Sequence, residues 1–276
     1  MTDGAAGSPP SSGRYRPPAL LSGSLGLHAA GAVALAVAPR HWPATMATLI
    51  ADHVVLTAAS LWPRGSWVGP NQSRLPASAA ARGEVALTFD DGPDPDVTPR
   101  VLDLLDRHGA RATFFCIGRR VRACPEIAAE IVRRGHRVEN HTETHPHLFA
   151  FYLASTLRRE VERAQDTIAT AAGHAPRLFR APAGLRNPLL DRVLFRAGLR
   201  LVSWTRRGFD ALEKDPGRIA RRLLAGLAAG DVLLLHDGSA HRPRGGNPVV
   251  LEVLPRVLDA LAARGLRSVP LLEAAG

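Results

Sequence analysis

The chain has few aromatic residues and few cysteines. Aromatic side chains make up 5% of its 276 residues, which is too few to predict a surface on which nucleic-acid bases stack. The two cysteines, Cys116 and Cys124, cannot build the disulfide framework of a small secreted domain. Lysine is almost absent, with Lys214 the only one, so the net charge of +10 comes from arginines scattered along helical stretches. We therefore expect a globular protein that does not bind nucleic acid.

Two apolar stretches lie near the N-terminus. Residues 1–18 are rich in Gly, Ser and Pro and predict a disordered tail. Residues 19–38 are long enough to span a bilayer. Residues 46–62 carry Asp52 and His53 near their middle, where an aspartate costs about 3 kcal/mol in a bilayer. The second stretch is therefore the weaker candidate for a membrane helix.

Four arrangements of these stretches remain open: a signal peptide, one anchor helix, a two-helix membrane hairpin, or a soluble hairpin packed on the main domain. A membrane hairpin would return the chain to its starting side, and the arginines that follow it fit the positive-inside rule: Arg64, Arg74 and Arg82. We favour association with a bacterial-type cell membrane. The side on which the main domain lies is not predicted.

From residue 81 to residue 276 the chain alternates between strand and helix patterns, which predicts one α/β catalytic domain after an N-terminal part of residues 1–80. Seven short apolar runs predict strands, at residues 85–89, 112–116, 136–139, 178–180, 199–204, 232–235 and 266–269. Alternating strands and helices favour a parallel sheet covered by helices, either doubly wound or closed into a short barrel.

Polar clusters follow five of these strands. They are Asp90–Asp91 and the motifs NHTETHPH, FRAPAG, SWTRRGFD and LLLHDG. Because the carboxyl ends of parallel strands meet at one face, a closed barrel would bring the five clusters together.

Two adjacent carboxylates at the end of an apolar strand need a positive partner. His141 and His145, four residues apart, can join one carboxylate as three metal ligands and leave positions open for water and substrate. The other carboxylate would then act as a base towards water at the metal. Arg180 offers the counter-charge that keeps this second acid ionised.

These motifs resemble the polysaccharide deacetylases of carbohydrate esterase family 4, also called the NodB homology domain. The resemblance runs in order from residue 84 to about residue 270. It implies a distorted (β/α)7-type barrel and a metal site made of Asp91, His141 and His145. It also implies catalytic roles for four residues: Asp90 as base, Arg180 as its orienting partner, His236 as acid and Asp210 as the partner of His236.

The resemblance further implies residues that contact the substrate. These are Ala183, whose backbone N–H would help to hold the oxyanion, Trp204, and Leu234 and Leu235, which would line the acetyl pocket. The chain departs from the family pattern at two places, with Ala183 where an aromatic residue is usual and Ala211 where tryptophan is usual. Both changes remove bulk that would face the sugar and leave the metal ligands intact.

The leading hypothesis is a metal-dependent hydrolase, using zinc or otherwise cobalt or nickel, that removes N-acetyl or O-acetyl groups. Its substrate would be an acetylated amino-sugar polysaccharide, peptidoglycan or glycolipid. A non-haem iron oxygenase would use the same ligand types but would leave Asp90, Arg180 and His236 without roles. A catalytically idle carbohydrate- or metal-binding module is the alternative from another class.

Overall fold

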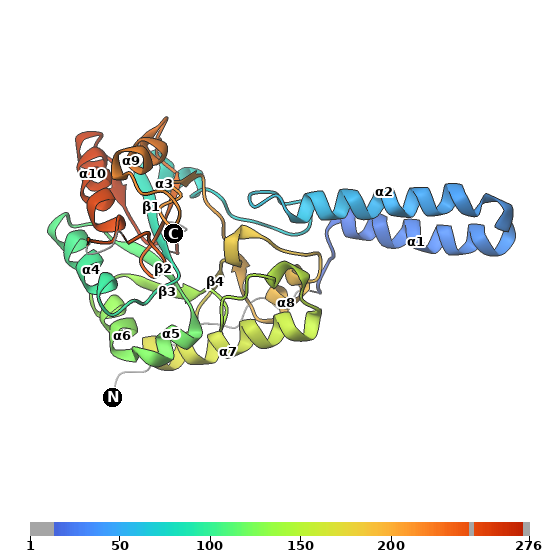
Figure 1. Ribbon diagram of the computed structural model, residues 1–276, viewed down its shortest axis with the longest axis horizontal. Coiled ribbons are helices and arrows are strands. Elements are labelled where there is room, and N and C mark those ends of the chain that lie inside the picture. Colours follow the sequence, from blue (N-terminus) through green and yellow to red (C-terminus); the bar gives the residue numbers. More distant parts are fainter. Residues whose placement is uncertain (1–13, 243–245, 273–276) are drawn as a thin grey trace.

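The structure, a computed structural model, describes residues 14–242 and 246–272, so most of the predicted disordered tail lies outside the described residues. It has two parts, a rounded α/β domain and a helical hairpin that projects from one side (Figure 1). The hairpin consists of helix α1 (Ala19–Val37), the short 3₁₀ helix η1 (Pro39–His41) and helix α2 (Trp42–Ser60).

The domain contains one sheet in which all paired strands are parallel. Its strands are β1 (Glu84–Asp90), β2 (Ala112–Cys116), β3 (Arg137–Asn140), β4 (Leu178–Phe179), β5 (Arg200–Leu201), β6 (Arg206–Arg207), β7 (Val232–His236) and β8 (Arg267–Ser268). The spatial order is β5-β4-β3-β2-β1-β7-β6, and β8 pairs with β1. The predicted α/β barrel is confirmed.

The barrel closes through one continuous stretch of chain, residues 200–207. At its start this stretch pairs with β4, and Val202 N donates to Phe179 O over 2.8 Å. At its end it pairs with β7, and Thr205 N donates to Val232 O over 2.9 Å. The single strand predicted at residues 199–204 contains only β5, and β6 begins after its end, because the chain changes its pairing partner midway.

Helices cover the outside of the sheet (Figure 1). They are α3 (Ala77–Ala81), α4 (Val97–Arg107), α5 (Gly118–Ala123), α6 (Pro125–Arg133), α7 (Ala154–Ala172), α8 (Leu190–Arg196), α9 (Pro216–Leu224) and α10 (Val250–Ala263), with 3₁₀ turns η2 (Phe149–Phe151) and η3 (Pro182–Gly184). Helix α9 begins where the Asp215 side chain accepts from Gly217 N over 2.7 Å. Helix α7 ends at Gly173, whose φ of 70° suits a residue without a Cβ.

Strand β1 separates two apolar layers. All seven of its residues are buried, as expected for a central parallel strand. Val85, Leu87 and Phe89 belong to the outer cluster beneath the helices. Ala86 belongs to the cluster inside the barrel, and by alternation Asp90 is on that same inner face. The last residue of β1 is thereby aimed at the barrel interior.

The segment between the hairpin and β1 packs against the barrel. Val68, Leu75 and Ala79 are buried, and the last two belong to the inner cluster. Gln72 forms a parallel bridge with Val202, so this segment runs along the closing stretch of the ring. The predicted division at residue 80 stays a prediction, but this packing favours a boundary nearer to the end of α2.

The two hairpin helices approach each other closely at Gly31, where an added Cβ would lie 3.3 Å from Thr45 Cγ2. Ser24 Oγ donates to Asp52 Oδ2 over 2.6 Å, so the aspartate of α2 has a partner on α1. Apolar side chains along the outside of both helices are exposed, among them Leu25, Val33, Ile50 and Val54. Within the described residues, α1 alone is both long and apolar enough to cross a membrane.

Candidate active site

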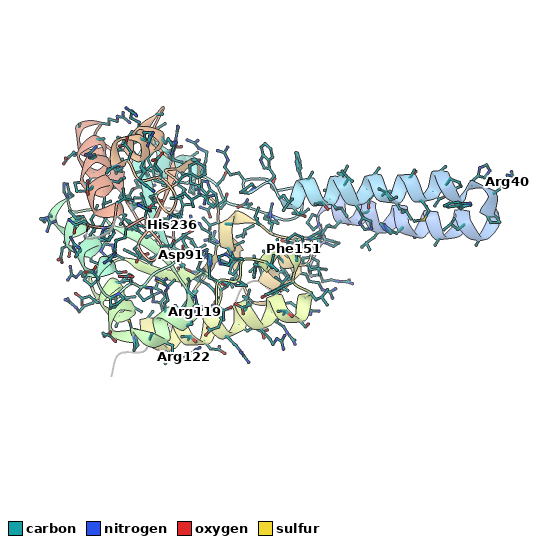
Figure 2. All side chains as sticks on the ribbon, viewed as in Figure 1. Arg40, Asp91, Arg119, Arg122, Phe151 and His236 are labelled. Atoms are coloured by element: carbon teal, nitrogen blue, oxygen red, sulfur yellow. The ribbon has the colours of Figure 1, made fainter. Side chains whose placement is uncertain are left out.

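The carboxyl ends of the strands bring the predicted site residues together at one edge of the barrel. Asp90 ends β1 and His236 ends β7, and the two face each other in the register of these strands. Figure 2 places Asp91 and His236 next to each other in the middle of the domain. The other residues follow neighbouring strands: His141 after β3, Arg180 after β4 and Asp210 after β6.

Asp91, His141 and His145 form a group with metal-ligand geometry. Asp91 Oδ1 lies 3.2 Å from His141 Nε2 and 3.1 Å from His145 Nε2. His141 Nδ1 lies 2.8 Å from Arg180 O, and donation to this carbonyl leaves a lone pair on Nε2. Asp91 Oδ1 is buried without a hydrogen-bond partner among the described residues. Lone pairs that converge on one point fit a divalent cation.

The backbone holds two of these ligands in an uncommon conformation. Asp91 has a φ of 72° and His145 a φ of 54°, in the left-handed region that costs L-residues about 1–2 kcal/mol. Thr142 Oγ1 accepts from His145 N over 3.0 Å and stabilises the loop after β3. Ser239 Oγ donates to Asp91 Oδ2, which orients the carboxylate from its other side. The backbone and the neighbouring hydroxyl groups thus hold the ligand side chains in position.

The nearest charged partner of Asp90 is an arginine, while His141 Nε2 lies 4.0 Å from its other carboxylate oxygen. Arg180 Nη1 donates to Asp90 Oδ1 over 2.6 Å, and both side chains are buried. The guanidinium also donates to Thr88 Oγ1 and to Ser203 O, over 2.8 and 3.0 Å. Its Cζ atom lies 4.1 Å from the centre of the Phe115 ring. These contacts fix the arginine, and through it the direction of the Asp90 carboxylate.

His236 and Asp210 form a second buried pair. His236 Nδ1 lies 2.8 Å from Asp210 Oδ1, and His236 N donates to Asp210 Oδ2 over the same distance. Burial alone would lower the pKa of His236, but the charge of Asp210 and this hydrogen bond raise it to about 9. Because Nδ1 is turned to Asp210, the Nε2 atom is the one available to a substrate.

The predicted substrate contacts divide into two groups. Trp204 and Leu234 belong to the cluster inside the barrel, whereas Leu235 belongs to the outer cluster beneath the helices. Since side chains alternate along a strand, Leu234 shares the face of His236 and Leu235 does not. Ala183 is exposed, with a φ of 54° in the loop after β4.

The sequence did not point to Ser239 or to Asp237 as part of the site. Asp237 follows His236 directly and is buried, and burial raises the pKa of its carboxyl group to about 7. Thr98 Oγ1 donates to its Oδ2 over 2.5 Å. Asp237 lies within the motif LLLHDG and Ser239 follows it directly. This position next to His236 is the feature of the sequence that could have indicated them as site residues.

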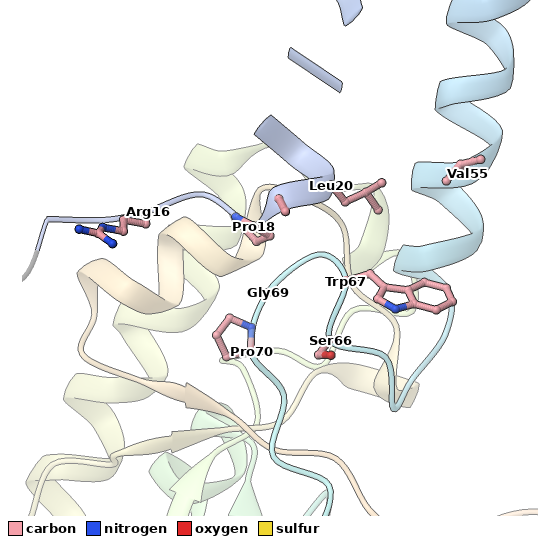
Figure 3. A pocket seen from close by; sticks show the side chains of 9 residues that line it. Arg16, Pro18, Leu20, Val55, Ser66, Trp67, Gly69 and Pro70 are labelled. Carbon is pink, nitrogen blue, oxygen red and sulfur yellow. The ribbon is translucent and has the colours of Figure 1, made fainter. Parts of the chain in front are cut away.

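A second group of metal-ligand type lies in the hairpin and consists of His28, Asp52 and His53. It is remote from the barrel edge, and Asp52 already accepts from Ser24. A cavity of about 800 Å³ lies at the base of the hairpin, between the start of α1, the end of α2 and residues 66–70 (Figure 3). Neither feature contains any of the predicted site residues.

Known proteins resemble this chain in both sequence and fold. The family profile described as polysaccharide deacetylase matches residues 77–202. A chitooligosaccharide deacetylase of Sinorhizobium fredii is 37% identical over 208 residues, covering 71% of this chain and 94% of the relative. A peptidoglycan-N-acetylglucosamine deacetylase of Bacillus cereus is 31% identical over 228 residues, covering 79% of this chain and 97% of the relative.

Two solved structures share the barrel. A peptidoglycan N-acetylglucosamine deacetylase superposes with a TM-score of 0.67 at 29% identity, covering 74% of this chain and 92% of that one. A family 4 carbohydrate esterase from Streptomyces lividans, in complex with acetate, gives a TM-score of 0.61 at 35% identity, covering 67% of this chain and 91% of that one. Both matches leave part of the chain uncovered.

Proposed function

The chain belongs to the polysaccharide deacetylase family and is a hydrolase that removes acetyl groups from amino-sugar glycans; from this premise we propose roles for its residues. The observation that carries the proposal is that the pair of Asp90 with Arg180 and the pair of His236 with Asp210 lie beside the metal-ligand group. An idle binding module is not favoured, because the base, the acid and all three ligands are present.

Asp91, His141 and His145 hold the metal ion, which we propose to be zinc. One carboxylate oxygen and two imidazole nitrogens are ligands typical of a catalytic zinc site. A bound zinc ion supplies a Lewis acid that polarises the acetyl carbonyl group and acidifies water. The buried lone pair of Asp91 Oδ1 supports this assignment, since it has no other partner among the described residues.

Asp90 acts as the general base and takes a proton from the attacking water. Arg180 holds the Asp90 carboxylate turned towards the site, because its guanidinium is fixed by several hydrogen bonds. The backbone N–H of Ala183 contributes to the binding of the oxyanion. Leu234, on the face that carries His236, lines the acetyl pocket.

His236 acts as the general acid. Its Nε2 proton goes to the nitrogen of the leaving amine when the amide C–N bond breaks. Asp210 holds the ring through Nδ1 and stabilises the imidazolium form. The products are acetate and the free amino sugar. The acetate bound to the Streptomyces lividans relative agrees with this chemistry.

We also propose that the hairpin lies in a membrane. Each of its helices has 19 residues and is therefore about 28 Å long, close to the thickness of a bilayer core. Exposed tryptophans mark both ends, with Trp42 at the tip and Trp62 and Trp67 at the base. The base is also the more basic end, with Arg14, Arg16 and Arg64. By the positive-inside rule, the domain then lies on the cytoplasmic side.

The direct test measures acetate released by the full-length protein with zinc from chitooligosaccharides, from O-acetylated glycans and from peptidoglycan fragments. We expect release from at least one N-acetylated glycan, abolished by a chelator and restored by zinc. Absence of acetate from every substrate, with zinc bound at the site, would contradict the proposed function.

A further inference from the structure

A basic and aromatic pocket lies directly beside the proposed catalytic site. Its volume is about 450 Å³, and it is lined by residues 62–64, by residues 204–207 with Phe209, and by Arg222 of α9. The first of these segments follows the hairpin, and the second is the end of the stretch that closes the barrel. The pocket is therefore built where the hairpin and the catalytic domain meet.

Four arginines line the pocket, and two of them have acidic partners among the described residues. Arg206 pairs with Asp231 at 2.8 Å, and Arg222 pairs with Glu213 at 3.3 Å. Among the described residues, the other two arginines pair with no carboxylate: Arg64, which donates to Thr205 O, and Arg207. This leaves two positive charges that face the pocket without a counter-ion.

Arg207 is held in place by aromatic rings. Its Cζ atom lies 5.2 Å from the centre of the Trp204 ring and 4.9 Å from that of Phe209. Its Nε atom is buried and has no hydrogen-bond partner among the described residues. A buried donor of this kind is costly unless a ligand accepts from it. The geometry thus favours an anion that takes two or more hydrogen bonds from guanidinium groups.

The pocket shares a wall with the catalytic site. Trp204 lines the pocket, and its ring centre lies 5.9 Å from Cζ of Arg180, the partner of Asp90. At Gly184, in the loop after β4, an added Cβ would lie 2.6 Å from the Trp204 ring and 2.9 Å from Pro63. Trp204 therefore connects the pocket to the arginine that pairs with Asp90.

The pocket also adjoins the end of the proposed membrane anchor. Helix α2 ends at Ser60, and Trp62 and Arg64 line the pocket. Trp67 lies beside the end of α2 at the base of the hairpin (Figure 3). A ligand in this pocket would be at the level of the lipid headgroups, where phosphate is the prevailing anion. A neutral polymer such as chitin would leave both unpaired arginines unused.

We propose that the substrate is an N-acetylated amino sugar joined through a phosphate or diphosphate to a membrane lipid, with Arg64 and Arg207 binding the phosphate. This inference rests on the proposed deacetylase function and on the membrane hairpin. Water cleaves the amide bond of the acetamido group to give acetate and an amine, and the phosphate linkage stays intact. A preceding reaction must therefore attach the N-acetylated sugar to the lipid phosphate.

The test compares three substrates for the full-length protein with zinc in detergent micelles. They are polyprenyl diphosphate-linked N-acetylglucosamine, soluble UDP-N-acetylglucosamine and neutral chitotetraose. We expect the highest kcat/KM for the lipid-linked sugar. Arg64→Gln and Arg207→Gln should each lower that value about tenfold or more, mainly by raising KM, because each removes a charge-assisted hydrogen bond. Their effect on chitotetraose should be much smaller.

Arg221→Gln is the matched control, since Arg221 is an exposed neighbour of Arg222 on α9 outside the pocket. It should leave kcat/KM for all three substrates unchanged. If the Arg64 and Arg207 variants lose kcat/KM equally for the lipid-linked and the neutral substrate, the proposed phosphate site is wrong. Equal kcat/KM values for the nucleotide sugar and the lipid-linked sugar would contradict the proposed recognition of the lipid. Either result leaves deacetylation itself standing, whereas no acetate from any substrate would contradict the proposed function.

Discussion

Arg180 Nη1 lies 2.6 Å from Asp90 Oδ1, while the adjacent Asp91 turns its Oδ1 towards two histidines. Two neighbouring aspartates thus have separate partners, a guanidinium for one and a metal-ligand group for the other. This separation gives each carboxylate a different nearest partner. It also allows their roles to be distinguished by experiment.

Asp90→Asn should retain the metal and lose most activity. Asparagine can still accept from Arg180 but cannot take a proton, and general-base catalysis typically contributes about 10²–10⁴-fold. Zinc content and kcat measured together test this expectation. Asp103→Asn, at an exposed aspartate paired with Arg134, is the control and should change neither value. Loss of zinc in Asp90→Asn would mean that the roles of the two aspartates are reversed.

His141→Ala should lower the zinc content by about one ion per chain, since three protein ligands are typical of a catalytic zinc site. Metal analysis after dialysis measures this change. His108→Ala serves as the control, because His108 pairs with Asp259 outside the site. A variant that lacks both His141 and His145 but keeps its full metal content would remove the site assignment.

Activity should fall on the alkaline side as pH rises through about 9, the pKa to which His236 is raised. The raised pKa keeps His236 protonated, and the acid is lost only above that value. Asp210→Asn removes the charge that raises the pKa, so the alkaline limb of the kcat/KM profile should move to lower pH, while the acid limb moves less. An alkaline limb that stays in place or rises would exclude Asp210 from the mechanism.

Full-length protein should fractionate with membranes, and a chain that begins at Pro63 should be soluble, because it lacks the apolar hairpin. A chain that begins at Ala80 also loses Val68 and Leu75, both buried against the barrel. Burial of two such side chains contributes about 3–6 kcal/mol, so the shorter chain should unfold at a clearly lower urea concentration. Equal urea midpoints for the two truncated chains would place the domain boundary at residue 80, as the sequence predicts.

The site could be predicted from the sequence because its residues follow strands whose ends must converge. Asp90 and Asp91 end a buried apolar run, and the spacing of His141 and His145 suggests metal ligands when it is combined with this pair of carboxylates and with the histidine of LLLH. In a parallel barrel such residues share one face. Site residues that are defined by their type and by their position at a strand end could therefore be predicted from the sequence.

Features that depend on tertiary partners could not be predicted. Strands β5 and β6 have two residues each, too few for an alternating pattern, and the change of partner within residues 200–207 leaves no local signal. Residues 68–79 resemble a linker in composition, yet they pack along the ring through bridges at Gln72 and Arg74. Leu234 and Leu235 are identical in type, and only the register of β7 separates their faces.

The short connection between the hairpin and the barrel fixes the distance between these two parts of the molecule. Helix α2 ends at Ser60, and Pro63 already lies against Gly184, next to the Trp204 ring. Three residues span at most about 10 Å, so the domain cannot move away from the end of the hairpin as it could on a long linker. With the hairpin in a membrane, as we propose, the site would reach sugars next to the bilayer surface and not the far units of a long glycan.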